Sequence, residues 1–139
     1  MVETFAIFIF FVMFTLAFIH LYWGHGKNWP GVNRQDLIDK VYGNGTQFPS
    51  IYACYAVALA LIVAGFIPLF STGIFSFPKQ NYISWANYLI ALPLFVRGLV
   101  GYLPFVEKKC TKIFVHYNRI IYNPLCILIA LSYAFLGYQ

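Results

Sequence analysis

The stretch TFAIFIFFVMFTLAFIHLYW, residues 4–23, decides the class of protein because it contains no Asp, Glu, Lys or Arg. A helix of about 20 apolar residues crosses the ~30 Å hydrocarbon core of a bilayer. Backbone groups in that core must pair within the segment, which a helix achieves for a continuously apolar run. Three further apolar stretches of similar length cover about 50–70, 82–103 and 120–138. We therefore predict four transmembrane helices.

The composition also indicates a membrane protein. The 139 residues are 61% hydrophobic and 9% charged, whereas about 25% of the residues in a soluble domain are charged. So few charges cannot cover the surface of a small soluble domain. The same composition excludes a disordered chain, a nucleic-acid-binding arm and a secreted disulfide scaffold. We predict a single all-α domain over residues 1–139, an integral membrane four-helix bundle with short cytoplasmic interfacial helices.

Basic residues are concentrated in two of the three connections. The connections at 24–49 and 104–119 hold seven of them: Lys27, Arg34, Lys40, Lys108, Lys109, Lys112 and Arg119. The connection between the second and third stretches holds only Lys79. Since cytoplasmic loops are enriched in Lys and Arg, both basic connections should face the cytoplasm and both termini the outside. Anionic headgroups beside these connections account for the net charge of +5, and no nucleic-acid partner is predicted.

Both basic connections carry helical signals. Asn33 can cap a short amphipathic helix that Gly43 ends, and this helix should lie on the membrane surface or fold over the bundle. Apolar residues recur at helical spacing over 106–121, which predicts an interfacial helix leading into the fourth span. Because Pro124 follows Asn123 at the joint, either a kinked continuous helix or a break capped by Asn123 is expected.

Two ionisable side chains lie within the predicted spans. His20 shares a helix face with Trp23 at the cytoplasmic end of the first span, either as part of an aromatic belt or as a ligand, proton carrier or substrate contact. Arg97 is the only charged residue well inside a span, and it either snorkels to the headgroups or faces the bundle. The small residues Gly98 and Gly101 beside it favour close helix contact and the inward option.

A polar cluster marks the start of the fourth span, with Asn118, Arg119, Tyr122 and Asn123 within six residues of one another. These side chains either cap and anchor the joint or line a cytoplasm-facing pocket. The predicted ligand-binding set is His20, Trp23, Arg97, Asn118, Arg119, Tyr122 and Asn123. No catalytic residue is identified.

The cysteines and histidines give little support for a redox or metal centre. Cys54, Cys110 and Cys126 have no Cys-x-x-Cys spacing and should be small apolar fillers. No acid stands at ligand spacing from a histidine, so no metal site is predicted. Haem b stays open as a cofactor, because His20 and His116 could both lie at the cytoplasmic interface as axial ligands.

Two motifs carry a resemblance to a known family. The run IHLYWGHG, residues 19–26, resembles the His-x-Tyr-Trp-Ala-x-Gly-Gly motif of a small bacterial four-span membrane protein family of unknown function. The run RIIYNPLC, residues 119–126, is similar to its Arg-x-x-Tyr-Ser-Pro-Leu-Cys signature. This chain has Asn118 where the family has Asp and Asn123 where it has Ser. The resemblance implies a bacterial inner-membrane protein and supplies no activity.

Three functions fit these observations. The hypothesis that requires least is a binding or accessory protein, which holds an apolar or anionic lipid-like ligand or docks a membrane partner. An alternative is a small intramembrane enzyme in which His20 is the general acid or base and Arg97 and Arg119 bind an anionic headgroup. A further alternative is a homo-oligomeric transporter, since four spans with one internal charge make a poor solitary pathway.

Overall fold

The computed structural model describes residues 2–72, 75 and 80–139, and this part of the chain is helical without any strand. Four helices are long and apolar enough to cross a membrane. They are α1 (Val2–Gly24), α3 (Ile51–Phe70), α4 (Gln80–Val100) and the continuous run Lys112–Tyr138, which ends in α7 (Asn123–Tyr138). The all-α class and the four apolar helices are confirmed. Lys79, which entered the orientation argument, lies outside the described residues.

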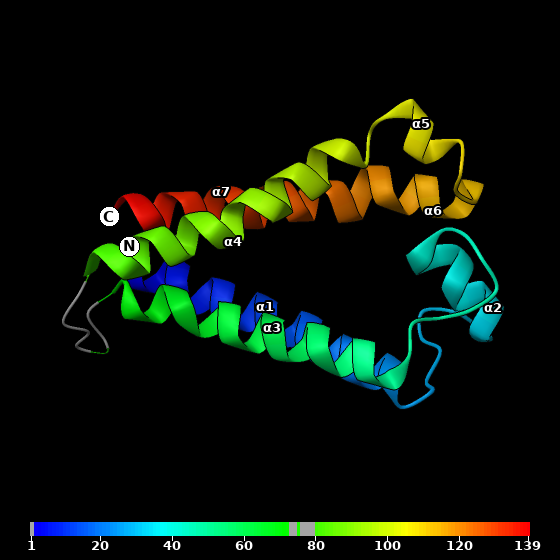
Figure 1. The fold of residues 1–139 in the computed structure, drawn as a ribbon, viewed down its shortest axis with the longest axis horizontal. Coiled ribbons are helices and arrows are strands. Elements are labelled where there is room, and N and C mark those ends of the chain that lie inside the picture. Colours follow the sequence, from blue (N-terminus) through cyan, green and yellow to red (C-terminus); the bar gives the residue numbers. More distant parts are fainter. Residues whose placement is uncertain (1, 73–74, 76–79) are drawn as a thin grey trace.

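The long helices form two antiparallel pairs (Figure 1). α1 packs along α3 and α4 packs along α7, whereas contacts between the two pairs are fewer. The start of α1 and the end of α7 lie at the same end of the bundle as the end of α3 and the start of α4. The two long connections, 25–50 and 101–111, lie at the opposite end, which we call the basic end. All seven basic residues of the predicted cytoplasmic connections therefore lie at or near one end of the molecule.

Small residues let the helices of each pair approach closely. A buried stripe on α1, spaced by three or four residues, comprises Ala6, Ile9, Met13 and Ala17. A Cβ atom at Gly65 of α3 would lie 3.2 Å from Met13 Cβ. In the other pair, a Cβ atom at Gly98 would lie 2.5 Å from Ile127 Cγ1, and one at Gly101 would overlap Asn123. The predicted close contact at Gly98 and Gly101 is confirmed.

A buried hydrogen bond joins the two pairs in the middle of the bundle. The Tyr133 hydroxyl of α7 donates to the Ala64 carbonyl of α3 at 2.8 Å, and Tyr133 is fully buried. Ala64 precedes Pro68 by four residues in α3. Because proline has no N–H, the Ala64 carbonyl has lost its ordinary helical donor. Tyr133 supplies that donor from the opposite pair.

The connection between α4 and α7 differs from the predicted interfacial helix over 106–121. α4 ends at Val100, short of the predicted 103, and the single turn α5 (Pro104–Glu107) begins at the proline after an extended Leu103. A new helix, α6 (Lys112–Tyr117), starts after Thr111, whose side chain accepts the Phe114 N–H. The prediction of one helix was wrong because Thr111 caps a second start that the apolar periodicity does not reveal.

The joint at Pro124 is a continuous helix, which decides between the two expected forms. The π-helical segment η2 (Asn118–Tyr122) runs directly from α6 into α7. The fourth apolar helix therefore begins at Lys112 rather than at the predicted position 120. A π-helical turn widens the helix locally, which is one way to accommodate the missing proline donor.

The first connection folds over the bundle. Asn33 caps α2 (Arg34–Leu37) by accepting the Asp36 N–H, and α2 continues into the π-helical segment η1 (Ile38–Tyr42), as predicted for a helix that begins at Asn33. Gly43 ends it with a φ of 89°. Leu37 and Ile38 are buried. Burial within the protein decides between the two predicted positions of this helix, so we call α2 and η1 together the cap.

The cap docks on the α6–η2 region, which belongs to the other helix pair. Thr111 donates its N–H to the Gly43 carbonyl at 2.7 Å and its hydroxyl to the Asp39 carbonyl at 2.6 Å. The Tyr122 hydroxyl donates to the Lys40 carbonyl at 3.1 Å. The cap thus links the two pairs at the basic end.

We predict that Tyr133→Phe lowers the free energy of unfolding by about 1–3 kcal/mol, because it leaves the buried Ala64 carbonyl without a donor. In a Pro68→Ala background the amide of residue 68 can donate to the Ala64 carbonyl. Tyr133→Phe should therefore lower the free energy of unfolding by less in that background. Denaturant unfolding of the four proteins in detergent micelles measures this double-mutant cycle. An equal cost in both backgrounds would contradict the explanation.

We predict that Thr111→Val loosens the cap. The change removes two hydrogen bonds of the Thr111 hydroxyl, the one it accepts from the Phe114 N–H at the start of α6 and the one it donates to the Asp39 carbonyl. Each contributes about 1 kcal/mol. Amide hydrogen exchange over residues 36–43 should accelerate, while exchange in the centre of α1 stays unchanged. Thr111→Ser retains the hydroxyl and is the matched control. Unchanged exchange in Thr111→Val would show that these bonds do not hold the cap.

Candidate functional site

The Arg97 cluster is a set of hydrogen-bonded side chains between the last turn of α4 and η2–α7. Arg97 donates through Nη1 to Asn123 Oδ1 and through Nη2 to Asn118 Oδ1, both at 2.9 Å. Asn118 Nδ2 donates in turn to the Gly101 carbonyl at 3.0 Å. Asn118 and Asn123 are buried, whereas Arg97 itself remains exposed. Arg97 is therefore oriented by α7 and still open to a partner from outside the chain.

No acidic side chain pairs with Arg97. All four acids lie within the described residues, and three are engaged elsewhere: Asp36 with Lys40 at 2.7 Å, Glu107 with Arg119 at 2.5 Å and Asp39 with the Gln35 amide at 2.9 Å. Glu3 lies in the first turn of α1, at the opposite end of the bundle. Among the described residues, no carboxylate side chain therefore balances the positive charge of Arg97.

Hydrogen-bond donors exceed acceptors in the Arg97 cluster. A guanidinium carries five N–H groups, and Arg97 uses one on each of two amide oxygens. Asn123 Nδ2 is a buried donor without a partner among the described residues. A group that accepts hydrogen bonds, and above all an anion, suits such an arrangement.

A second cluster forms where α1 enters the first connection. The His20 and Trp23 rings lie 5.1 Å apart, and Trp23 Nε1 donates to the Trp29 carbonyl at 2.7 Å. His20 Nδ1 lies 2.8 Å from the Leu16 carbonyl. A carbonyl only accepts, so Nδ1 is the donor of this hydrogen bond. Phe48 packs edge-on against Trp23 at 5.9 Å.

The predicted ligand-binding residues thus divide into groups. Arg97, Asn118 and Asn123 form one hydrogen-bonded cluster, while Arg119 pairs with Glu107 and Tyr122 with the cap. Within the described ranges, no hydrogen bond or ring contact joins His20 or Trp23 to the Arg97 cluster. Binding of a ligand by these seven residues stays a prediction.

Sequence reasoning missed two polar residues that organise the bundle, Tyr133 and Asn87, and at Gly101 it predicted the close helix contact but not the carbonyl that accepts a hydrogen bond from Asn118. Gly101 supplies both a carbonyl for Asn118 and the flat surface on which Asn123 lies. Tyr133 was hidden among other apolar positions, although Pro68 four residues after Ala64 signals a carbonyl in need of a donor. Asn87 is fully buried near the other end and donates to Ser71 at 2.9 Å. Its apolar sequence neighbours gave no indication of that role.

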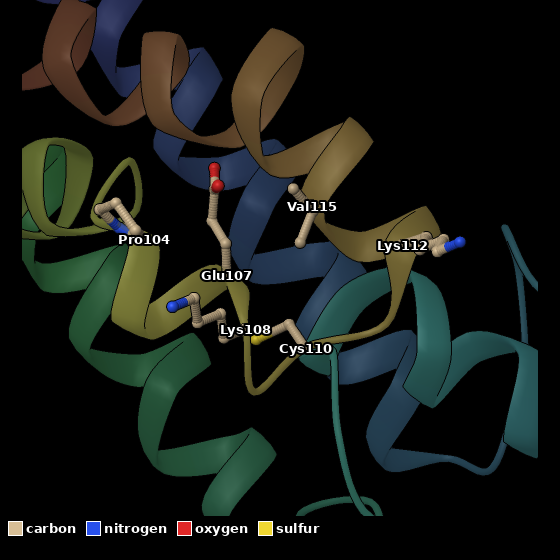
Figure 2. Close-up of a pocket in the computed structure, with 6 residues that line it drawn as sticks. All are labelled: Pro104, Glu107, Lys108, Cys110, Lys112 and Val115. Atoms are coloured by element: carbon tan, nitrogen blue, oxygen red, sulfur yellow. The ribbon is translucent and has the colours of Figure 1, made fainter.

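A hollow of about 360 Å³ lies between α5 and α6 (Figure 2). Lys108 and Lys112 line it but extend to opposite sides, so their charges do not converge. Burial raises the pKa of the Cys110 thiol, although the charge of Arg97 acts in the opposite direction. A thiol with a raised pKa is a poor nucleophile near neutral pH. This hollow therefore offers less to a ligand than the Arg97 cluster.

An apolar groove of about 550 Å³ runs between α3 and α4. Its walls contain several alanines, including Ala60 on α3 and Ala86 on α4. No charged or polar side chain lines it. In the described part of the chain, no three His, Cys, Asp or Glu side chains gather as potential metal ligands.

The architecture defines a helical protein with four membrane-capable helices and a polar cluster at one end. The chain belongs to the family described as protein of unknown function (DUF3995), whose model matches residues 13–133. This match confirms the prediction that the chain belongs to a family of unknown function. No curated protein and no solved structure matches the chain.

We predict that acid weakens the contact between α5 and η2. The hydrogen bond from Arg119 holds the pKa of the Glu107 carboxyl below its ordinary value of 4.5. A depressed pKa means that the ionised carboxylate stabilises the fold above the unfolded pKa, and that this stabilisation is lost as the pH falls through the folded pKa. Glu107→Gln should therefore unfold more easily than the unmodified protein at neutral pH.

The difference in the free energy of unfolding between Glu107→Gln and the unmodified protein should decrease below pH 4.5 and then vanish. Denaturant unfolding in detergent micelles across this pH range measures it. Arg119→Gln is the matched control, since it breaks the same ion pair and should lose the same stability at neutral pH. A difference that stays constant with pH would contradict the ion-pair explanation.

Proposed function

We propose that this protein is a multi-pass membrane protein that binds an anionic lipid-like molecule through Arg97, oriented by Asn118 and Asn123. The observation that carries the proposal is an exposed arginine held by two neutral amide oxygens, with every acid of the chain placed elsewhere. A charged side chain within a transmembrane segment is energetically costly unless it is paired or reaches the lipid headgroups. An anion from outside the chain would supply that pairing.

The position of Arg97 suits a headgroup ligand. It lies in the last turn of α4, three residues before the helix ends at Val100. At a rise of 1.5 Å per residue, this places it about 5 Å from the helix end, near the level of lipid phosphates. Asn118 and Asn123 fix the plane of the guanidinium, which favours recognition of a phosphate or carboxylate by two parallel hydrogen bonds.

The proposed orientation places the basic end in the cytoplasm, as the distribution of Lys and Arg suggests. Anionic lipids of the cytoplasmic leaflet attract basic segments beside the membrane. A bacterial inner membrane is the location that the motif resemblance implies. In this orientation Arg97 would meet its ligand in the cytoplasmic leaflet.

The geometry supports binding better than catalysis by His20. A general base must lie within hydrogen-bond reach of the group on which it acts. Among the described residues, His20 contacts Leu16 and Trp23 rather than the Arg97 cluster. The surroundings of His20 are aromatic, with Trp23 packed against Phe48. His20 is therefore better explained as an anchor of the first connection.

We predict that Arg97→Gln reduces affinity for an anionic lipid by about 10- to 100-fold, because hydrogen bonds to charged groups contribute about 1.5–3 kcal/mol. Arg97→Lys should fall between, since an ammonium keeps the charge without the planar fork. Native mass spectrometry of the detergent-solubilised protein, titrated with phosphatidic acid or with phosphatidylcholine, measures the affinity.

Lys109→Gln is the matched control for Arg97→Gln, because it removes one exposed positive charge at the same end. Its affinity for phosphatidic acid should change less than about twofold if exposed charges are screened. Equal losses in both variants would indicate a diffuse basic surface. Unchanged binding in Arg97→Gln would exclude the proposed site.

A further inference from the structure

We infer that the groove between α3 and α4 holds the acyl chain of the ligand whose headgroup binds Arg97. The ligand class is then an anionic amphiphile with at least one long acyl chain, rather than a small soluble anion. This inference rests on the proposed function. It adds a second contact region, made of residues other than Arg97, Asn118 and Asn123. An experiment can therefore contradict the inference about the groove without contradicting the proposed function.

The groove and Arg97 lie on one face of α4. Ala86 and Ile90 line the groove, and Arg97 follows them by eleven and seven residues. At 3.6 residues per turn, both spacings return to within about 20° of the same direction. Arg97 therefore continues the line of groove residues, about 10 Å beyond Ile90 toward the basic end.

The chemistry of the groove suits a hydrocarbon chain. Small side chains such as Ala60 and Ala86 leave the hollow open, and its volume is about 550 Å³. Pro68 frees the Ala64 carbonyl, which accepts the Tyr133 hydroxyl, and Pro93 frees the Leu89 carbonyl of α4 in the same way. No polar side chain lines the groove. The side chains of the groove thus present an apolar surface to its occupant.

The groove lies within reach of a chain that starts at Arg97. From Ala86 to Arg97 the axis of α4 advances about 16 Å. On α3 the lining runs from Ala56 to Ile67 of the helix Ile51–Phe70, so the groove crosses the middle of the bundle. A lipid with its phosphate on Arg97 would direct its chain from the basic end into the middle of the groove.

Ala60→Phe tests the inference by filling the groove from an exposed position of α3. Three probes are titrated by native mass spectrometry: long-chain phosphatidic acid, dihexanoyl phosphatidic acid and inorganic phosphate. We expect the long-chain lipid to bind at least tenfold more tightly than the short-chain lipid, because each buried methylene adds affinity. Ala60→Phe should remove about tenfold of the long-chain affinity and leave the other two probes unchanged.

Ala53→Phe is the matched control, since it adds the same ring to an exposed alanine of α3 outside the groove lining. It should leave all three affinities unchanged. If Ala60→Phe does not fold, Ala60→Leu fills the groove with a smaller side chain and should reduce the long-chain affinity in the same direction.

Three other outcomes would overturn the inference, and they distinguish its failure from that of the proposed function. If all three probes bind equally and Arg97→Gln abolishes their binding, the site takes a free phosphate and the groove holds no chain. If no probe binds in a manner that depends on Arg97, the proposed function fails as well. A loss of long-chain affinity that is equal in Ala60→Phe and Ala53→Phe would also overturn the assignment to this groove.

Discussion

The hydrogen bond from the Tyr133 hydroxyl to the Ala64 carbonyl holds the two helix pairs together in the middle of the bundle. Pro68 creates the need for it by removing the helical donor of that carbonyl. Without water, an unpaired carbonyl costs several kcal/mol in an apolar environment. The Tyr133 hydroxyl of α7 therefore replaces the hydrogen-bond donor that α3 lacks at Ala64. The same hydrogen bond connects two helix pairs that otherwise share few contacts.

At the basic end, the two helix pairs are joined by a different contact, the docking of the cap on the α6–η2 region. The cap comes from the connection between α1 and α3. Its carbonyl groups at Asp39 and Lys40, and that of Gly43 directly after it, accept hydrogen bonds from the α6–η2 region. Burial of Leu37 and Ile38 keeps the cap on the protein. Because the pairs are held at their centre and at this end, α3 and α4 need not pack tightly along their length. The apolar groove lies between them.

The candidate site shows how far residue types alone lead. The sequence identified Arg97 as the unusual charge and Asn118 and Asn123 as polar residues at the same level, and the structure joins these three by hydrogen bonds. Arg119 and Tyr122 belonged to the same predicted set, but each has a structural partner, Glu107 and the cap respectively. Sequence spacing places residues at a common depth, whereas it does not show which neighbouring element each side chain reaches.

The sequence by itself determined the four apolar helices and the clustering of basic residues at one end, because length, hydropathy and charge act locally along the chain. It also determined the capped helix after Asn33, since a cap depends on neighbours within one turn. Only the tertiary structure decided which helices pair, where the cap docks and that Tyr133 serves Ala64. Those contacts join residues distant in sequence, and small residues such as Gly101 permit them only when a particular partner approaches.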